Sequence, residues 1–447
     1  MPVRPAPVSP ALAAPQFPVP EVPAPQGPLA RLAPETAHLR WEGLPDAFRP
    51  DYRRSLTGVF PTLFALLGYG AESFPNLLAH LPLDAPRRAK RGFVLCLDGF
   101  GFKQMAGSQR FRDLYPRCGT WLTSVFPSIT SCALSSLYQA LPPARHGILG
   151  HLVWKDFPGA VVDMLRMQVG GASAPLIAAG FDVQRWKREP GFLETPVGTA
   201  LPGYHLMPYA IVGSGLSQYS YGKSVLVGFV EALEGFTKAA KILGEMSQGW
   251  VGLYLPTIDS LSHALGGAAP QVGLAARQIE EAFSWMVKQL PAQVVDDTLF
   301  MVIADHGQAD LRHVLAWEGE RREFLQLHTR AVGFSGRVMH LYATPEQLRE
   351  LLPWLAEQVG DAGAVVPFDQ ARALVGLENG SAADAEWVRQ TLGGAVVVLR
   401  DGYNWDKQGL TQSAHKPYIT QLVSQHGGLT WDEMFVPWLC GPLSAMA

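Results

Sequence analysis

The sequence predicts an α/β protein whose core is a largely parallel β-sheet with helices on both faces. Three short apolar runs show no alternation with polar residues: Gly92–Leu97, Trp250–Leu255 and Leu299–Ala304. Strands that are apolar on both faces are typical of parallel sheets buried between helices. An amphipathic helix is predicted over Gln271–Leu290, between the last two runs. A strand–helix–strand unit of this kind implies a parallel pair with a right-handed crossover.

The length and composition favour an ordinary globular protein of the cytoplasm. The 447 residues suit one large domain with insertions or two to three smaller ones. A net charge of -3 without a long basic run favours neither a nucleic-acid polymer nor an anionic membrane as a partner. The four cysteines are far apart, which is unlike a zinc-binding cysteine site or a disulfide framework. No run approaches the roughly 18 apolar residues of a membrane span, and we recognise no signal peptide. The oligomeric state is left open.

The remaining segments differ in character along the chain. Residues 1–36 form a Pro/Ala-rich arm, expected to be extended or disordered because proline disfavours helix and removes backbone donors. Residues 37–447 are expected to form one domain. Within it Val153–Gly244 is less regular and is expected to supply loops and short elements at the rim of a pocket. Residues 330–405 are predicted to be a small inserted α+β subdomain. Its predicted strands and helix are Val338–Tyr342, Pro345–Val359, Ala364–Val366 and Ala395–Leu399.

Metal-ligand side chains follow two of the buried strands. Asp305 and His306 come directly after Leu299–Ala304, and Asp98 comes directly after Gly92–Leu97. Because ligands bind at the carboxyl ends of parallel strands, we expect chemistry at these positions. Each has a structural alternative: Asp305 as a helix cap with His306 satisfied in the core, and Asp98 as part of an ordinary Asp-Gly turn.

Three further candidates lie elsewhere in the chain. Asp259 and His263 are four residues apart, so on a helix they share one face and can reach one metal ion. An exposed Asp–His pair is the alternative. His426, followed by two glycines, is the last candidate ligand, for which a buried structural histidine is the alternative.

A hydroxyl-rich segment precedes a predicted helix in the stretch Val125–Gly150. Pro127 ends an extended segment, and Thr130 stands where helical periodicity begins. A hydroxyl at a helix start is either an N-cap or a nucleophile whose neighbouring N–H groups attract an anion such as phosphate.

The candidate ligands together form a mainly Asp/His set without cysteine. They are Asp98, Thr130, Asp259, His263, Asp305, His306 and His426. Oxygen and imidazole ligands suit catalytic zinc, with manganese as the competitor. Seven groups exceed one catalytic zinc site and suit two divalent ions about 4 Å apart, which clamp the attacking and leaving oxygens of a phosphoryl transfer.

The order of these motifs resembles the alkaline phosphatase superfamily, and within it the type I phosphodiesterase and nucleotide pyrophosphatase branch. The motifs are Asp98-Gly99, Pro127–Thr130, Asp259-x-x-x-His263, Asp305–Gly307 and His426–Gly428. The branch's Val-Phe-Pro-x-x-Thr segment and its Pro-x-x-His-Gly-Ile segment both occur, the second at Pro143–Ile148. The resemblance implies an alkaline-phosphatase-like core over roughly residues 92–439.

The resemblance also implies a role for each ligand. One ion would be held by Asp259, His263 and His426, and the other by Asp98, Asp305 and His306. Thr130 would be both a ligand and the nucleophile that forms a phosphothreonine intermediate. The implied activity is hydrolysis of a small-molecule phosphodiester or nucleotide pyrophosphate.

Two positions depart from the branch. Its members have an aromatic directly after the nucleophile and an Asn beyond the His-Gly-Ile segment, whereas Ser131 and His151 stand here. His151 is expected to donate to a phosphate oxygen. Tyr254 matches an aromatic that lines the pocket, so Tyr254 and Ser131 are expected to contact the substrate.

Related activities are distinguished by their own motifs. A sulfatase needs a Cys/Ser-x-Pro-x-Arg segment, which none of Cys118, Cys132 and Cys440 begins. A phosphomonoesterase, a phosphoglycerate-mutase-like phosphotransferase and an inactive metal-binding relative stay open as alternatives.

Overall fold

A computed structural model of the protein describes residues 35–70, 73–86, 88–407, 410 and 422–447. The Pro/Ala-rich arm therefore lies, except for its last two residues, outside the described residues. None of the described helices has the length and apolar character needed to cross a membrane. Cys96, Cys118, Cys132 and Cys440 are all buried and unpaired.

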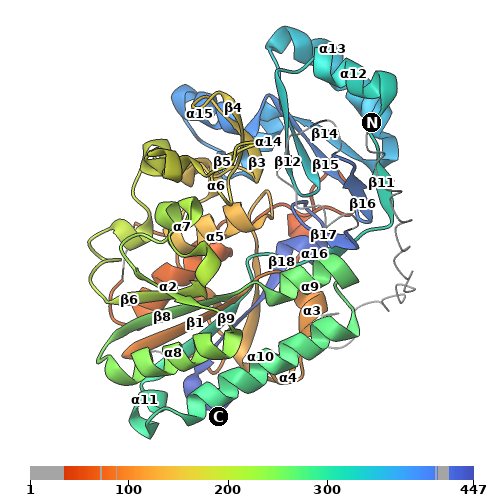
Figure 1. The fold of residues 1–447 in the computed structure, drawn as a ribbon. Helices are drawn as coiled ribbons and strands as arrows, with labels where there is room; N and C mark the ends of the chain where they lie inside the picture. Colours follow the sequence, from red (N-terminus) through yellow and green to blue (C-terminus); the bar gives the residue numbers. More distant parts are fainter. Residues whose placement is uncertain (1–34, 71–72, 87, 408–409, 411–421) are drawn as a thin grey trace, which may run out of the picture.

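A seven-stranded, mostly parallel sheet forms the larger part of the molecule, in the order β2-β18-β9-β1-β8-β6-β7 (Figure 1). Its strands are β1 Arg91–Leu97, β2 Gly119–Thr123, β6 Gly203–Pro208, β7 Val225–Phe229, β8 Gly249–Leu255, β9 Thr298–Ile303 and β18 Phe435–Pro442. The strands predicted from the apolar runs are β1, β8 and β9, which lie side by side in the middle with β1 parallel to both neighbours. β18 alone runs antiparallel to its neighbours, β2 and β9. The predicted α/β class is confirmed.

Helices cover both faces of this sheet. Successive side chains of a strand point to opposite faces, and in β1, β8 and β9 both sets are mainly apolar. Phe93 of β1 packs against Phe236 of α8 (Ala232–Glu245) and Phe283 of α10 (Pro270–Lys288). The neighbouring Gly92 faces Leu63 of α2 (Val59–Leu66) on the other side. The helix predicted between β8 and β9 is therefore present as α10, and β1 lies between the two strands that it connects.

A second seven-stranded sheet, antiparallel throughout, lies above the first in Figure 1, in the order β14-β15-β13-β12-β3-β4-β5. The stretch 330–405 supplies β12 Ala331–Ser335, β13 Val338–Tyr342, β14 Gly363–Pro367 and β15 Ala395–Leu399. The other strands are β3 Leu152–Lys155, β4 Ala160–Asp163 and β5 Gln168–Val169. Two distant stretches of the chain thus share one sheet.

The region 153–244, expected to consist of loops and short elements, contains several short strands that join the two sheets. It supplies most of β3, all of β4 and β5 for the second sheet, and β6 and β7 for the central sheet. Its strands are short and are broken by glycine and proline, which hides their periodicity.

The other elements connect or flank the sheets. Small two-stranded pairs are formed by β10 (Ala309–Asp310) with β17 (Ser424–Gln425) and by β11 (His313–Leu315) with β16 (Tyr403–Trp405). The remaining α-helices are α3 Phe102–Met105, α4 Arg110–Cys118, α5 Thr130–Gln139, α6 Pro143–His146, α7 Gly215–Ser220, α9 Thr257–Leu265, α11 Ala292–Asp296, α12 Gly319–Leu327, α13 Pro345–Val359, α14 Phe368–Leu374, α15 Ala382–Leu392 and α16 Trp431–Met434.

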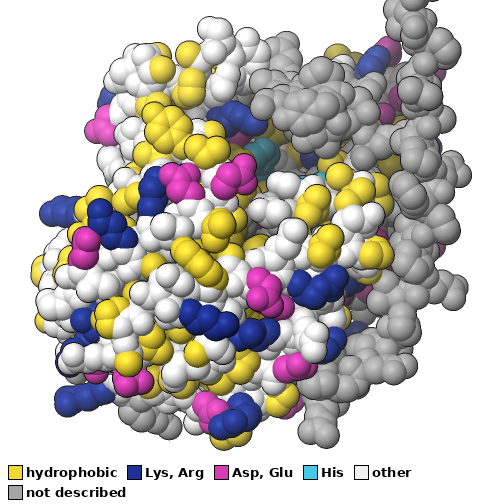
Figure 2. Space-filling model, turned by 60° about the horizontal axis from the view of Figure 1, so that its bottom comes forward, with side chains coloured by type: hydrophobic (Ala, Val, Ile, Leu, Met, Phe, Trp, Pro, Cys, Tyr) yellow, Lys and Arg dark blue, Asp and Glu magenta, His cyan; other side chains and the backbone are white. Residues whose placement is uncertain are grey.

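The surface carries charges of both signs. In Figure 2, lysine and arginine side chains are interspersed with aspartate and glutamate, and apolar side chains lie between them. Such a mixed surface matches the near-neutral net charge of the chain.

Candidate metal centre

The candidate ligands converge at the carboxyl end of the central sheet, between the two sheets, where α5, α9 and β17 are labelled in Figure 1. Asp98 follows β1, and Asp305 and His306 lie just beyond β9. Asp259 and His263 lie on α9, which begins directly after β8. Neighbouring parallel strands end at one edge, so the sheet itself brings these side chains together.

Asp98, Asp305 and His306 form the more deeply buried group. The Nε2 atom of His306 lies 3.4 Å from Oδ1 of Asp98 and 3.2 Å from Oδ2 of Asp305. These two carboxylate oxygens are buried without a hydrogen-bond partner among the described residues. A buried charge without a partner is costly, so the unpartnered oxygens fit a bound cation.

Asp259, His263 and His426 form the second group. Oδ1 of Asp259 lies 3.3 Å from Nε2 of His263 and 3.5 Å from Nε2 of His426. The His306 and His426 rings stack, with their centroids 3.6 Å apart, which joins the two groups. His306 also lies within metal-ligand reach of Asp259 and His426, as well as of Asp98 and Asp305.

Backbone carbonyls orient the three imidazoles. The Nδ1–H of His263 donates to the carbonyl of Ser424 at 2.8 Å, that of His306 to Gly307 at 3.0 Å, and that of His426 to Ser128 at 2.9 Å. A histidine tied at Nδ1 presents Nε2 as a lone-pair donor, which is the usual arrangement of a metal-ligating histidine. The donor set and its orientation therefore suit zinc.

The pKa values of the three carboxylates are shifted in different directions. Burial, reinforced by Asp305 and Asp259, raises the pKa of Asp98 well above its ordinary value. Burial likewise raises the pKa of Asp305. Burial also acts to raise the pKa of Asp259, but the neighbouring His263, His426 and His306 rings outweigh it and lower that pKa. Carboxylates crowded together in a dry site favour bound cations, which remove their mutual repulsion.

Thr130 stands against the deeply buried group. It is the first residue of α5, and its hydroxyl lies 3.1 Å from Nε2 of His306. The first N–H groups of a helix have no partner within the helix, so this helix start is suited to an anion beside the hydroxyl.

The other predicted site residues are placed differently. The Ser131 side chain is buried, and its hydroxyl donates to the carbonyl of Gly150 at 3.0 Å. The Tyr254 hydroxyl donates to the Asp98 carboxylate, and its ring is buried. Neither side chain forms a stacking wall in this arrangement, and Tyr254 orients a candidate ligand instead.

His151 directly precedes β3 of the second sheet. Its Nε2 is 3.8 Å from Oδ1 of Asp163, and about a fifth of its side chain is exposed (21%). Burial lowers the pKa of His151 in spite of Asp163, so the imidazole is neutral near pH 7 and keeps one N–H to donate.

Some contributors to the site were not singled out from the sequence. The amide of Gln308 donates to Oδ1 of Asp259, and the hydroxyl of Ser424 donates to the Gln308 side-chain oxygen at 3.0 Å. Gln308 directly follows Asp305-His306-Gly307, and that position beside a ligand motif was the one available signal. Ser424 has no such signal because it is brought in by the β10–β17 pairing.

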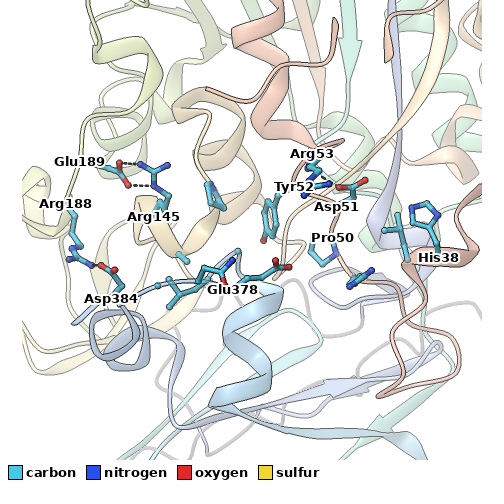
Figure 3. A pocket seen from close by; sticks show the side chains of 18 residues that line it. His38, Pro50, Asp51, Tyr52, Arg53, Arg145, Arg188, Glu189, Glu378 and Asp384 are labelled. Carbon is cyan, nitrogen blue, oxygen red and sulfur yellow. Dashed lines mark hydrogen bonds and ion pairs between the residues drawn. The ribbon is translucent and has the colours of Figure 1, made fainter. Parts of the chain in front are cut away.

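A separate cavity of about 1000 Å³ does not belong to this centre. None of the candidate site residues lines it. Figure 3 shows two ion pairs among its charged side chains, Arg145 with Glu189 and Arg188 with Asp384. Paired surface charges offer little net attraction to a ligand.

Known structures share this fold at low sequence identity. No protein-family model matches the chain, and no curated protein matches it either. Murine ectonucleotide pyrophosphatase/phosphodiesterase 5 is similar with a TM-score of 0.57 at 15% identity, covering 78% of this chain and 87% of that one. The human counterpart gives 0.57 at 13%, covering 78% and 87%. Phosphonoacetate hydrolase from Sinorhizobium meliloti 1021, in complex with phosphonoformate, gives 0.55 at 15%, covering 83% and 95%.

These similarities bear on the resemblance predicted from the motifs. The solved structures are alkaline-phosphatase-like enzymes, and each is covered over most of its length. The resemblance is thus confirmed for the architecture, and the fold of this chain is that of the alkaline phosphatase superfamily.

Proposed function

We propose that the protein is a metal-dependent hydrolase of phosphate esters, acting on small-molecule phosphodiesters with Thr130 as the nucleophile. One observation carries the proposal. The Thr130 hydroxyl, at the start of a helix, lies 3.1 Å from Nε2 of His306, which belongs to a buried cluster of carboxylates and imidazoles. The similarity to a pyrophosphatase/phosphodiesterase and to a phosphonoacetate hydrolase supports the same reaction class.

The cofactor in this proposal is a pair of divalent ions, zinc with manganese as the competitor. Asp98, Asp305 and His306 would hold one ion and Asp259, His263 and His426 the other. Bound there, the ions would lower the pKa of the Thr130 hydroxyl and neutralise charge on the oxygens of the phosphoryl group.

The residues of the chain would then act as nucleophile and as hydrogen-bond donors to the phosphoryl group. The Thr130 hydroxyl oxygen attacks phosphorus in line, so its bond to phosphorus forms as the bond to the leaving oxygen breaks. The leaving group departs as an alcohol, taking up one proton in place of the one that the Thr130 hydroxyl gives up. Water then breaks the phosphothreonine bond and restores the hydroxyl. The N–H groups at the start of α5, and the neutral imidazole of His151, are suited to hold nonbridging oxygens during both steps.

The substrate preference rests on what surrounds Thr130. No arginine stands between Ser128 and Ala133 to meet a second nonbridging charge, which favours a diester over a monoester. The Ser131 hydroxyl donates to the Gly150 carbonyl and the Tyr254 hydroxyl donates to Asp98, so neither side chain offers a free ring face and a stacked nucleobase is not required by this site.

A substrate panel with zinc-loaded protein tests the proposal. We expect bis(p-nitrophenyl) phosphate to be hydrolysed faster than p-nitrophenyl phosphate, and phosphonoacetate to release little phosphate. A strong preference for the monoester would replace the diesterase with a phosphatase, and a preference for phosphonoacetate with a phosphonate hydrolase. Zinc-binding protein with no turnover of any of the three would favour an inactive metal-binding relative.

A further inference from the structure

The turn Ser335–Arg337, which connects β12 to β13, contacts the backbones of His426, a candidate metal ligand, and of His151. The backbone N–H of Arg337 donates to the carbonyl of His426 at 3.2 Å. The hydroxyl of Ser335 accepts from the backbone N–H of His151 at 2.9 Å. One tight turn of the second sheet therefore holds the backbones of His426 and His151, which come from distant parts of the chain.

The contact with His426 leaves no room for a side chain. Gly336 has a φ of +59°, and a Cβ added to it would lie 1.8 Å from the carbonyl oxygen of His426. Gly427 has a φ of +113°, and a Cβ added there would lie 2.2 Å from the carbonyl oxygen of Ser335. Both positions need glycine for conformation and for space, so the two backbones are in direct contact.

A buried ion pair fixes the same loop from its other side. The Arg337 guanidinium pairs with Glu433, and both side chains are fully buried (0% and 0%). Glu433 also accepts from the N–H groups of Gly428 at 2.8 Å and Thr430 at 3.1 Å. Nε of Arg337 donates to the carbonyl of Tyr403 at 2.8 Å. Since a buried ion pair contributes little net stability, a role in fixing geometry is the better explanation.

We propose that the β12–β13 turn is the positioning element of the metal centre, with Ser335, Gly336 and Arg337 as positioning residues. The turn sets where the imidazole of His426 meets Asp259 and where His151 meets the substrate. This inference rests on the proposed function in so far as His426 is a metal ligand. It adds that the ion at Asp259, His263 and His426 depends on the second sheet, whereas the ion beside β1 and β9 does not.

Gly336→Ala tests the inference, with Gly360→Ala as the matched control. Gly360 has a similar φ of +49° but nothing within 4 Å of an added Cβ, so the control reproduces the backbone strain without the collision. Zinc binding to metal-free protein is measured by titration against a chromogenic chelator. Mutation of residues that orient metal ligands typically lowers metal affinity by about 10-fold to 100-fold. We expect Gly336→Ala to weaken one of two zinc ions by that amount, and Gly360→Ala to bind both normally.

The outcomes separate this inference from the proposed function. Two ions bound with parental affinity by folded Gly336→Ala would overturn the positioning role while leaving the hydrolase intact. A parent protein that binds neither zinc nor manganese would overturn the proposed function and this inference with it. Thermal unfolding of the metal-free variants shows whether Gly336→Ala is folded.

Ser335→Ala keeps the inference testable if Gly336→Ala does not fold. It removes one hydroxyl, and the buried hydroxyl of Ser284, which has no hydrogen-bond partner among the described residues, offers Ser284→Ala as the control. We expect Ser335→Ala to retain two zinc ions and to bind inorganic phosphate about tenfold more weakly, because the His151 N–H loses its acceptor. Unchanged phosphate binding would overturn the positioning of His151.

Discussion

The two groups of candidate metal ligands are held in contrasting ways. Asp98, Asp305 and His306 directly follow neighbouring parallel strands in the middle of the central sheet and are almost fully buried. Asp259 and His263 lie on a helix and have partly exposed side chains (15% and 20%). His426, their partner, lies on a loop that contacts the second sheet. The positions of residues at strand ends are fixed by the hydrogen bonds of the sheet. The positions of the second group depend on how its helix and loop pack against their neighbours.

Removal of the proposed nucleophile should have the largest effect and leaves the carboxylates and imidazoles of both groups unchanged. Thr130→Ala is expected to lower turnover of a phosphodiester by about 10³-fold or more, because the covalent step is lost. Both zinc ions should stay bound, since every carboxylate and imidazole ligand remains. Thr130→Ser should retain measurable activity. Steady-state kinetics measures the turnover and elemental analysis measures the bound zinc. Thr237→Ala, at an exposed position of α8, is the control. Parental activity in Thr130→Ala would show that another group is the nucleophile.

A change in the sheet-anchored group should be the next largest. Asp305→Asn keeps the shape of the side chain but removes the charge, so we expect the affinity of this ion to fall by at least about 100-fold. Turnover should fall with it, because Thr130 loses the ion beside it. Zinc titration of the metal-free variant measures the effect. If the ion at Asp259 is lost instead, the assignment of the two groups is reversed.

A change in the loop-borne group should be more selective. His426→Ala is expected to lower bound zinc toward one ion per chain and to slow hydrolysis of phospho-Thr130 more than its formation. Elemental analysis after dialysis, together with burst kinetics, measures both. If His426 were only a buried structural residue, thermal stability would fall while two zinc ions stayed bound.

The smallest effect concerns pH and the second sheet. Burial, against a hydrogen bond to the carbonyl of Leu392, lowers the pKa of His340 from 6.5 to about 4. Between pH 6.5 and 4 the unfolded chain therefore binds a proton at His340 that the folded chain does not bind. The free energy of unfolding falls as the pH falls through this window. A single proton corresponds to about 1.4 kcal/mol per pH unit. Denaturant unfolding at several pH values should show a slope smaller by about one proton for His340→Gln. Equal slopes would show that His340 titrates normally.

Local patterns predicted the parts of the molecule that are local in origin. The strands β1, β8 and β9 and the candidate ligands after them could be found because an unbroken apolar run that ends in Asp or His is visible in a short window. His263 could be found because helical spacing links it to Asp259. The antiparallel insertion of β18 and the sharing of one sheet by β3–β5 with β12–β15 could not be found, because pairing between remote strands leaves no mark in either strand.

Side-chain direction was the other limit. Ser131 follows the predicted nucleophile, and Tyr254 precedes Asp259, so both were expected to contact the substrate. In the structure one hydroxyl donates to a backbone carbonyl and the other to Asp98. Spacing along the chain tells which residues are near a site, but the local packing decides which side chains face it.

The place of β18 in the central sheet has a consequence for biosynthesis. β18 lies between β2 and β9, inside the sheet, although it is far later in the sequence than either strand. While the ribosome is still translating the stretch between β9 and β18, the facing edges of β2 and β9 have no strand between them. Unpaired strand edges favour aggregation, and long-range pairing is slow to form. The nascent chain should therefore depend on chaperones until residues 435–442 have emerged.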